Sequence, residues 1–234
     1  AAQVVALGAV NWRLTWLREW PISHLVSALG QGGWCLGMRV GVSASSAEVG
    51  EALRLFDYVE TYDSPVQGQA YHSRCAKGSV RGSYLYIVRH LDCGSPLAAD
   101  SQVLYENVYT MSYEETVRRL GNRALLLDVG HAFISDMKAR GRFELERWLG
   151  LSPVAVHLHN VRYVPDPTGV IYNAPYADHQ PLNEGLIDMR EALREIVRAG
   201  VKYVTVEVSF WGYAPASYPL AEKRRWVDEL LRGL

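Results

Sequence analysis

The stretch Ala124-Leu125-Leu126-Leu127-Asp128-Val129-Gly130-His131 decides the fold of this chain. A run of aliphatic residues ends abruptly in an acid, a glycine and a histidine. A continuous apolar run without alternation is typical of a parallel strand that is buried on both faces. Asp128 and His131 then stand at the carboxyl end of the strand, where parallel α/β folds keep their chemistry. The stretch therefore predicts a reaction site at the mouth of a parallel sheet.

Apolar segments of this kind recur along the chain and alternate with helical patterns. We expect strands at 39–43, 57–62, 69–74, 84–90, 103–109, 124–128, 154–159 and 203–208. Capping signatures predict helices that start at Ser45, Ser112 and Asp188, because each of these residues is followed three positions later by a glutamate. These helices should run to Phe56, Gly121 and Gly200. Further helical patterns cover 136–149 and the segment after Pro219.

This alternation predicts one fold class. Strands that alternate with helices at this spacing indicate a parallel sheet. Eight candidate strands and no dinucleotide-type glycine fingerprint favour a closed (β/α)8 TIM barrel over a doubly wound sheet. No helix is evident after the segment around His72, so the barrel is expected to be trimmed in its first half. A loop is expected at 163–183.

The first 37 residues have the least readable pattern. We expect an N-terminal segment at 1–37 and the barrel domain at 38–234. One hypothesis takes Met38 as the native start and 1–37 as an upstream extension. The alternative takes residues 4–10 as the first strand and Met38 as an ordinary internal methionine. The sequence leaves both open.

Composition sets broad limits. The chain has 234 residues, enough for one large α/β domain or two small ones, and its formal net charge of −1 gives no support to a global nucleic-acid or membrane field. Cys35, Cys75 and Cys93 are odd in number and irregularly spaced, so we expect no disulfide framework and a reducing, cytoplasmic location. The apolar N-terminus is too short to span a bilayer, and no membrane contact is expected.

Histidines and acids gather at the predicted strand ends. Glu106, Asp128 and Glu207 occupy such positions, together with five of the chain's seven histidines. The five are His72, His90, His131, His157 and His179, and His159 lies two residues beyond His157. A single histidine at a strand end is usually only hydrogen-bonded. Converging acids and imidazoles are most simply satisfied by a divalent cation, and a mixed set of nitrogen and oxygen ligands suits Zn, Mn, Co or Fe.

Six segments carry a resemblance to a known superfamily. They are Tyr105-Glu106-Asn107, Leu127-Asp128-Val129-Gly130-His131, Val156-His157-Leu158-His159-Asn160, Asp178-His179-Gln180-Pro181-Leu182-Asn183-Glu184-Gly185, Ile187-Asp188 and Val206-Glu207-Val208. In order and spacing they resemble the xylose-isomerase-like TIM barrel superfamily. It includes sugar-phosphate isomerases and epimerases and the endonuclease IV proteins (AP endonuclease family 2). The resemblance runs from about residue 38 to the C-terminus.

The resemblance implies a site with one to three divalent metal ions, zinc, manganese or cobalt. The central metal would be held by Glu106, Asp128, His157 and Glu207. A second would be held by His72 and His90, which would share Glu106. His131 and His179, with Asp178, would face a third metal or the substrate. Relatives often have an acid where Asn160 stands and a glycine where Asn183 stands. Ala177 stands where endonuclease IV proteins have an acid, which weakens the implied third site.

Three further residues have alternative interpretations. Glu60, at the end of the second strand, would bind substrate or form a structural ion pair. Arg162 would bind a hydroxyl or phosphate, or be a solvated loop arginine. Cys93 would touch the site or be a packed thiol.

Two functions follow, and a third is disfavoured. The first is a metal-dependent isomerase or epimerase of a sugar or related polyol, phosphorylated or not. Glu106 and Glu207 would remove and return a proton at carbon, through an enediolate stabilised at a metal-bound carbonyl, while His131 and His179 orient hydroxyls. The alternative is a zinc-dependent phosphodiester hydrolase of the endonuclease IV type, with DNA as its partner. The short connections at 43–83 and the scattered arginines favour the isomerase. A barrel that binds a metabolite without turnover is disfavoured by the nearly intact ligand set.

Overall fold

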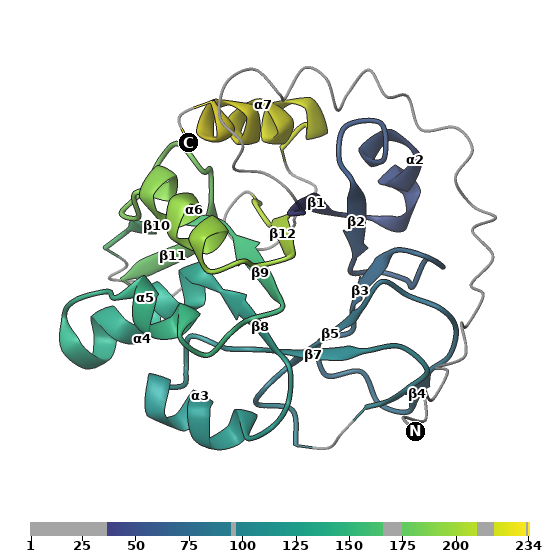
Figure 1. Ribbon diagram of the computed structural model, residues 1–234, viewed down its shortest axis with the longest axis horizontal. Helices are drawn as coiled ribbons and strands as arrows, with labels where there is room; N and C mark the ends of the chain where they lie inside the picture. The colour runs from purple at the N-terminus through teal and green to yellow at the C-terminus, as the bar shows by residue number, and fades with distance from the viewer. Residues whose placement is uncertain (1–36, 95–96, 166–174, 210–217, 233) are drawn as a thin grey trace, which may run out of the picture. The chain divides into compact units, whose positions relative to one another are not determined.

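The computed structural model describes residues 37–94, 97–165, 175–209, 218–232 and 234. Eight parallel strands close into a barrel in the order β1-β12-β9-β8-β7-β5-β3-β2 (Figure 1). The strands are β1 (Arg39–Ala44), β2 (Tyr58–Thr61), β3 (Ala70–His72), β5 (Ile87–His90), β7 (Val103–Glu106), β8 (Leu125–Asp128), β9 (Ala155–Leu158) and β12 (Tyr203–Val206). The (β/α)8 barrel expected from the sequence is confirmed.

The ring closes at β1. Val42 lies opposite Val59 of β2 on one side and opposite Val206 of β12 on the other. The strand considered at 4–10 lies outside the described residues, and the division at residue 37 stays a prediction.

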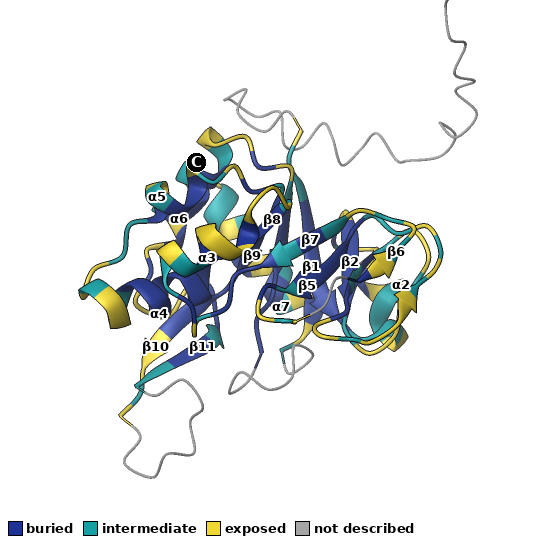
Figure 2. Ribbon diagram, turned by 90° about the horizontal axis from the view of Figure 1, so that it is seen from below, coloured by how far each residue is buried: buried dark blue, intermediate teal, exposed yellow. Residues whose placement is uncertain are grey.

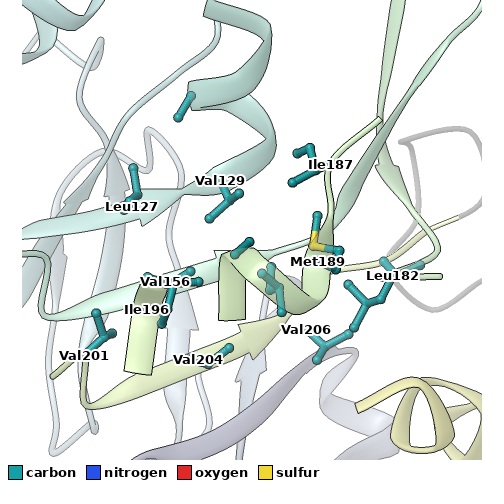
Figure 3. Packing of buried hydrophobic residues seen from close by; sticks show 14 of the residues in the cluster. Leu127, Val129, Val156, Leu182, Ile187, Met189, Ile196, Val201, Val204 and Val206 are labelled. Atoms are coloured by element: carbon teal, nitrogen blue, oxygen red, sulfur yellow. The ribbon is translucent and has the colours of Figure 1, made fainter. Parts of the chain in front are cut away.

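Apolar side chains fill two separate volumes. Inside the barrel lie Tyr58, Tyr86 and smaller aliphatic residues of β3, β5, β7, β8 and β9. Outside it, side chains of β8, β9 and β12 pack against α4 (Val129–Arg140) and α6 (Met189–Arg198), as Figure 3 shows for Leu127, Val156 and Ile196. Because each strand is covered on both faces, the apolar run at 124–127 has no polar alternation. The strands of the barrel are accordingly mostly buried, and exposed residues lie on the helices and in the segments outside the barrel strands (Figure 2).

Three predicted helices are confirmed. Helix α3 (Tyr113–Leu120) starts after Ser112, whose side chain accepts a hydrogen bond from the backbone N–H of Glu115, and ends at Gly121. In α6, Asp188 accepts from the backbone N–H groups of Arg190 and Glu191. Helix α7 (Leu220–Leu231) follows Pro219. The sequence located these helices because their caps are local signals.

The helix after β1 is shorter than predicted. A 3-10 turn, η1 (Ser46–Glu48), leads into α2 (Val49–Ala52), which ends before Phe56. The backbone N–H of Ser45 donates to Glu48 (2.9 Å), so the predicted capping contact is present.

The predicted helix at 136–149 is wrong in its boundaries. Helix α4 starts directly after β8, because Asp128 both ends the strand and caps the helix by accepting from the backbone N–H of His131 (2.7 Å). It stops at Gly141, whose φ of 69° is the left-handed conformation of a helix C-cap. A separate helix, α5 (Leu145–Leu149), follows. His131 therefore lies in the first turn of a helix.

The first half of the barrel is trimmed, as expected. Between Leu53 and Ser112 the described residues form no helix. Two short strands, β4 (Ser79–Val80) and β6 (Ala98–Ala99), pair with each other there. In Figure 1 the helices α3 to α7 lie around the opposite part of the ring.

The loop predicted at 163–183 contains regular structure. Strand β10 (Asn160–Tyr163) pairs antiparallel with β11 (Tyr176–Gln180). Residues 166–174 lie outside the described residues. The hairpin matters because β11 carries Asp178 and His179.

Cys75 and Cys93 form a disulfide, which corrects the expectation of unpaired thiols. Each cysteine lies three residues beyond a histidine, His72 or His90, and these histidines end neighbouring strands of the barrel. The pairing depends on strand order and cannot be seen in the spacing. It also removes the cysteine argument for a reducing compartment, so the cytoplasmic location stays a prediction. No helix in the described part of the chain is long and apolar enough to cross a bilayer.

Candidate metal centre

Four buried side chains converge at the carboxyl ends of β7, β8, β9 and β12. They are Glu106, Asp128, His157 and Glu207, and one ligand atom from each lies within 4.8 Å of the others. Nδ1 of His157 lies 2.8 Å from Oε2 of Glu207 and 3.9 Å from both Oε1 of Glu106 and Oδ2 of Asp128. This is the set expected for the central metal.

The hydrogen bonding of this cluster fits a bound cation. Among the described residues, no conventional hydrogen bond reaches Oε2 of Glu106, Oε2 of Glu207 or either ring nitrogen of His157, and all four atoms are buried. Buried polar atoms normally have a partner. Ligand atoms that each lie about 2.0–2.2 Å from one zinc ion are roughly 3–4 Å apart. The separations of 2.8–3.9 Å from Nδ1 of His157 are close to this range. The residues present therefore fit a divalent metal.

A second cluster adjoins the first through Glu106. Its Oε2 atom lies 3.1 Å from Nε2 of His72 and 3.5 Å from Nε2 of His90, and these two nitrogens are 3.1 Å apart. The other oxygen, Oε1, faces His131 (3.3 Å) and His157 (3.9 Å). Glu106 thus presents one oxygen to each cluster, as a bridging carboxylate would.

A third group gathers around Asp178 on β11. Its carboxylate lies 3.6 Å from Nε2 of His131 and 3.1 Å from Nδ1 of His179. His159 brings its ring within ligand distance of both histidines. All of the predicted metal ligands are therefore placed in one continuous cluster.

Glu60 lies beneath the ligands and is fully buried. Its Oε1 atom is 2.8 Å from Nε2 of His157 and 3.3 Å from Nδ1 of His72. The hydroxyl of Tyr86 donates to its other oxygen (3.1 Å). These contacts and the burial of the carboxylate support the ion-pair interpretation of Glu60, and together with His72 and His157 it forms a further group that could hold a metal ion.

Arg162 is half exposed and forms an ion pair with Glu184 (2.6 Å), which is also exposed. This ion pair fits the alternative in which Arg162 is a solvated loop arginine.

Asn160, which stands where relatives often have an acid, is buried. Its side chain accepts from the backbone N–H of Ile187 (3.0 Å) and donates to the carbonyl of the same residue (3.0 Å). Asn160 therefore fixes the loop after the β10–β11 hairpin.

Two residues that were named from the sequence without a role in the site support it. The amide of Asn107 accepts from the backbone N–H of Asp128 (2.7 Å) and donates to its carbonyl (3.0 Å), which fixes the end of β8. His159 contacts Asp128 and His179. Their positions in the sequence were the available signal, because Asn107 directly follows Glu106 and His159 lies two residues beyond His157.

Charges within the cluster balance each other. Burial alone would raise the pKa of Glu106, but His90 and His72 hold it well below its usual range. Burial alone would lower the pKa of His157, but the carboxylates of Glu60 and Glu207 hold it well above its usual range. Protons on the imidazoles thus offset the carboxylates, and a bound metal would take the place of these protons.

Comparison with known proteins supports the fold. No protein-family model matches the chain, and no curated protein matches it in sequence. A solved structure described as a "xylose isomerase-like TIM barrel/4-hydroxyphenylpyruvate dioxygenase fusion protein" is similar, with a TM-score of 0.51 and 12% sequence identity. The match covers 85% of this chain and 42% of that chain, so this chain spans less than half of the fusion protein. The likeness supports the fold of this chain, a closed (β/α)8 barrel.

Proposed function

We propose that the protein is a divalent-metal-dependent isomerase or epimerase of a sugar or related polyol, phosphorylated or free. The observation that carries the proposal is the convergence of Glu106, Asp128, His157 and Glu207 at the barrel mouth. The mouth of a (β/α)8 barrel is where catalytic residues collect. Zinc, manganese and cobalt all suit this mixed ligand set, with one to three ions.

The bound metal would polarise a substrate carbonyl, which acidifies the neighbouring carbon. Glu207 is the better placed of the two predicted bases, because 8% of its side chain is exposed compared with 1% for Glu106. In an isomerase Glu207 would take the proton from one carbon and return it to the neighbouring carbon, and in an epimerase Glu106 would return it to the opposite face of the same carbon. His131 and His179 orient substrate hydroxyls beside Glu207, whose Oε1 lies 3.7 Å from Nε2 of His179.

The arrangement of arginines supports a small substrate over DNA. Arg118, Arg140, Arg194 and Arg224 each pair with an acid three or four positions away on the same helix. Such pairs cancel charge locally, whereas a DNA-binding surface needs unpaired cations that face phosphates.

One observation favours a second candidate, a zinc-dependent phosphodiester hydrolase of the endonuclease IV type. The cluster of His72, His90 and Glu106 adds a second metal position that proton transfer does not require. Two ions a few ångströms apart are typical of enzymes that stabilise both the attacking and the leaving oxygen of a phosphodiester.

Metal analysis combined with two activity assays tests the proposal. The purified protein is loaded with Zn2+, Mn2+ or Co2+, and an anomalous-scattering map counts the ions. The isomerase proposal expects deuterium from solvent to enter a ketose or aldose, with no cleavage of abasic DNA. Close to three zinc ions per chain together with abasic-site cleavage would overturn it and establish the hydrolase.

A further inference from the structure

His159 lies at the centre of the cluster, although it is not one of the predicted ligands. It follows β9 and is fully buried. Its Nε2 atom lies 3.0 Å from the Asp128 carboxylate. Its ring stacks on that of His179, with centroids 4.3 Å apart and an angle of 11° between the planes. His159 thus contacts one residue of the central cluster and one residue of the third group.

Both ring nitrogens of His159 are already occupied. The backbone N–H of His179 donates to Nδ1 (2.9 Å), which also lies 3.2 Å from the carbonyl oxygen of Asn160. With Nδ1 as an acceptor, Nε2 is the donor to the Asp128 carboxylate. Both nitrogens therefore contact other residues of the cluster. These contacts are those of a side chain that holds its neighbours in place, and its ring also lies close to His131 and His179.

The contact with His179 holds an unusual backbone. His179 has a φ of 54°, a left-handed conformation that is uncommon for residues other than glycine. The hydrogen bond from its backbone N–H to His159 and the stacking of the two rings compensate for this strain. The same imidazole also orients Asp128, so the geometry of two groups depends on one side chain.

Gly130 makes room for this ring. A Cβ atom at position 130 would lie 2.0 Å from Cε1 of His159, with Nδ1 at 2.5 Å. Gly130 is in the first turn of α4, and no positive φ requires a glycine there. Glycine disfavours helices relative to alanine, so its presence is explained by the close approach of the imidazole.

We propose that His159 is a positioning residue that aligns Asp128 and His179 for metal and substrate. Position 130 must then be a glycine, because a side chain there would overlap with the ring of His159. The inference rests on the metal centre of the proposed function. It does not depend on whether the reaction is isomerisation or hydrolysis, because it concerns how the ligands are held.

The test measures the affinity of the protein for Zn2+ and Mn2+ by competition with a chelator, alongside circular dichroism and thermal unfolding. We expect His159→Ala to weaken metal binding by about 10–100-fold, as is usual when a group that orients a ligand is lost. His159→Gln, which keeps an N–H donor for Asp128, should recover much of this loss. Gly130→Ala should weaken binding similarly, because the new methyl group displaces the imidazole.

The decisive variant is the double substitution. Once His159→Ala has removed the ring, Gly130→Ala should cause no further loss of metal affinity. The matched control is Gly50→Ala in α2, where an added Cβ meets no atom of the described residues within 4 Å, and it should leave metal affinity unchanged. Additive losses in the double variant, or wild-type affinity in a folded His159→Ala protein, would overturn the inference. Absence of isomerase activity with these affinities as expected would overturn the proposed reaction alone.

Discussion

Oε1 of Glu60 lies 2.8 Å from Nε2 of His157, whose other ring nitrogen, Nδ1, faces the central cluster. A carboxylate on the far nitrogen of a ligating histidine raises the basicity of the ring and fixes its orientation. Glu60 also lies 3.3 Å from His72, so it supports a ligand in each of the two adjoining clusters.

Glu60→Gln should therefore lower metal affinity by about 10–100-fold while leaving the side chain close to its original size. Chelator competition with Zn2+ measures the change. The matched control is Glu184→Gln, an exposed residue whose partner is Arg162. Equal affinities for the two variants would show that Glu60 does not support the ligands.

Glu207→Gln should reduce turnover by about 10²–10⁴-fold, the usual contribution of general acid–base catalysis. The amide cannot accept the proton that the carboxylate takes in the proposed reaction. Turnover under metal saturation is compared with that of Glu195→Gln, a half-buried glutamate of α6. Wild-type turnover in a folded Glu207→Gln protein would refute the assignment of Glu207 as the base.

His90→Ala should remove one metal ion and leave the central one. His90 contributes to the second cluster alone, with Nε2 3.5 Å from Glu106. Metal counting by elemental analysis, before and after the substitution, measures the loss. If the isomerase proposal holds, proton exchange into a sugar should persist in this variant, whereas a two-metal hydrolase should lose its activity.

The metal-free protein should become less stable as the pH rises from 6.5 to 8. Burial opposes the charge on the histidines, but Glu106 raises the pKa of His72 to about 9, and Asp178 raises that of His179 to about 10. In the unfolded chain both titrate near 6.5. Between these pKa values the native state holds more protons than the unfolded state. The stabilisation that the two histidines provide is therefore fully present below pH 6.5 and is lost as the pH rises through their folded-state pKa values.

Urea denaturation in the presence of a chelator measures this dependence. Above pH 8 the buried amine of Lys223 contributes in the opposite direction, because burial lowers its pKa to about 8. Saturating metal should remove the decline, since the metal binds the deprotonated ligands. A metal-free protein whose stability increases between pH 6.5 and 8 would contradict the charge balance described for the cluster.

Reduction of the Cys75–Cys93 disulfide should lower the free energy of unfolding by about 3 kcal/mol. The bond closes a loop with a sequence separation of 18 residues, and a cross-link of this length removes roughly that much entropy from the unfolded chain. Denaturation with and without a reductant measures the difference. In Cys75→Ser/Cys93→Ser the reductant should have no effect, and an equal response of both proteins would exclude the disulfide as its cause.

Much of the fold was predictable because its signals are local. The apolar run before Asp128 indicates a strand covered on both faces, and the caps at Ser112 and Asp188 mark helix starts within a few residues. The start of α4 was missed because Asp128 serves two elements at once. The β10–β11 hairpin was missed because its strands are separated by residues 164–175, and its pairing gives no periodic signal in the sequence.

By itself the sequence determined which side chains reach the carboxyl ends of the strands, since parallel strands all end at the same edge of a barrel. Only the tertiary structure decided which atoms face one another. It divides the two oxygens of Glu106 between two clusters, places Glu60 under the histidines and pairs Cys75 with Cys93. It also brings His159 into contact with both Asp128 and His179. The physical reason is that strand position follows from short-range patterns, whereas hydrogen-bond direction and charge pairing depend on residues far apart in the chain.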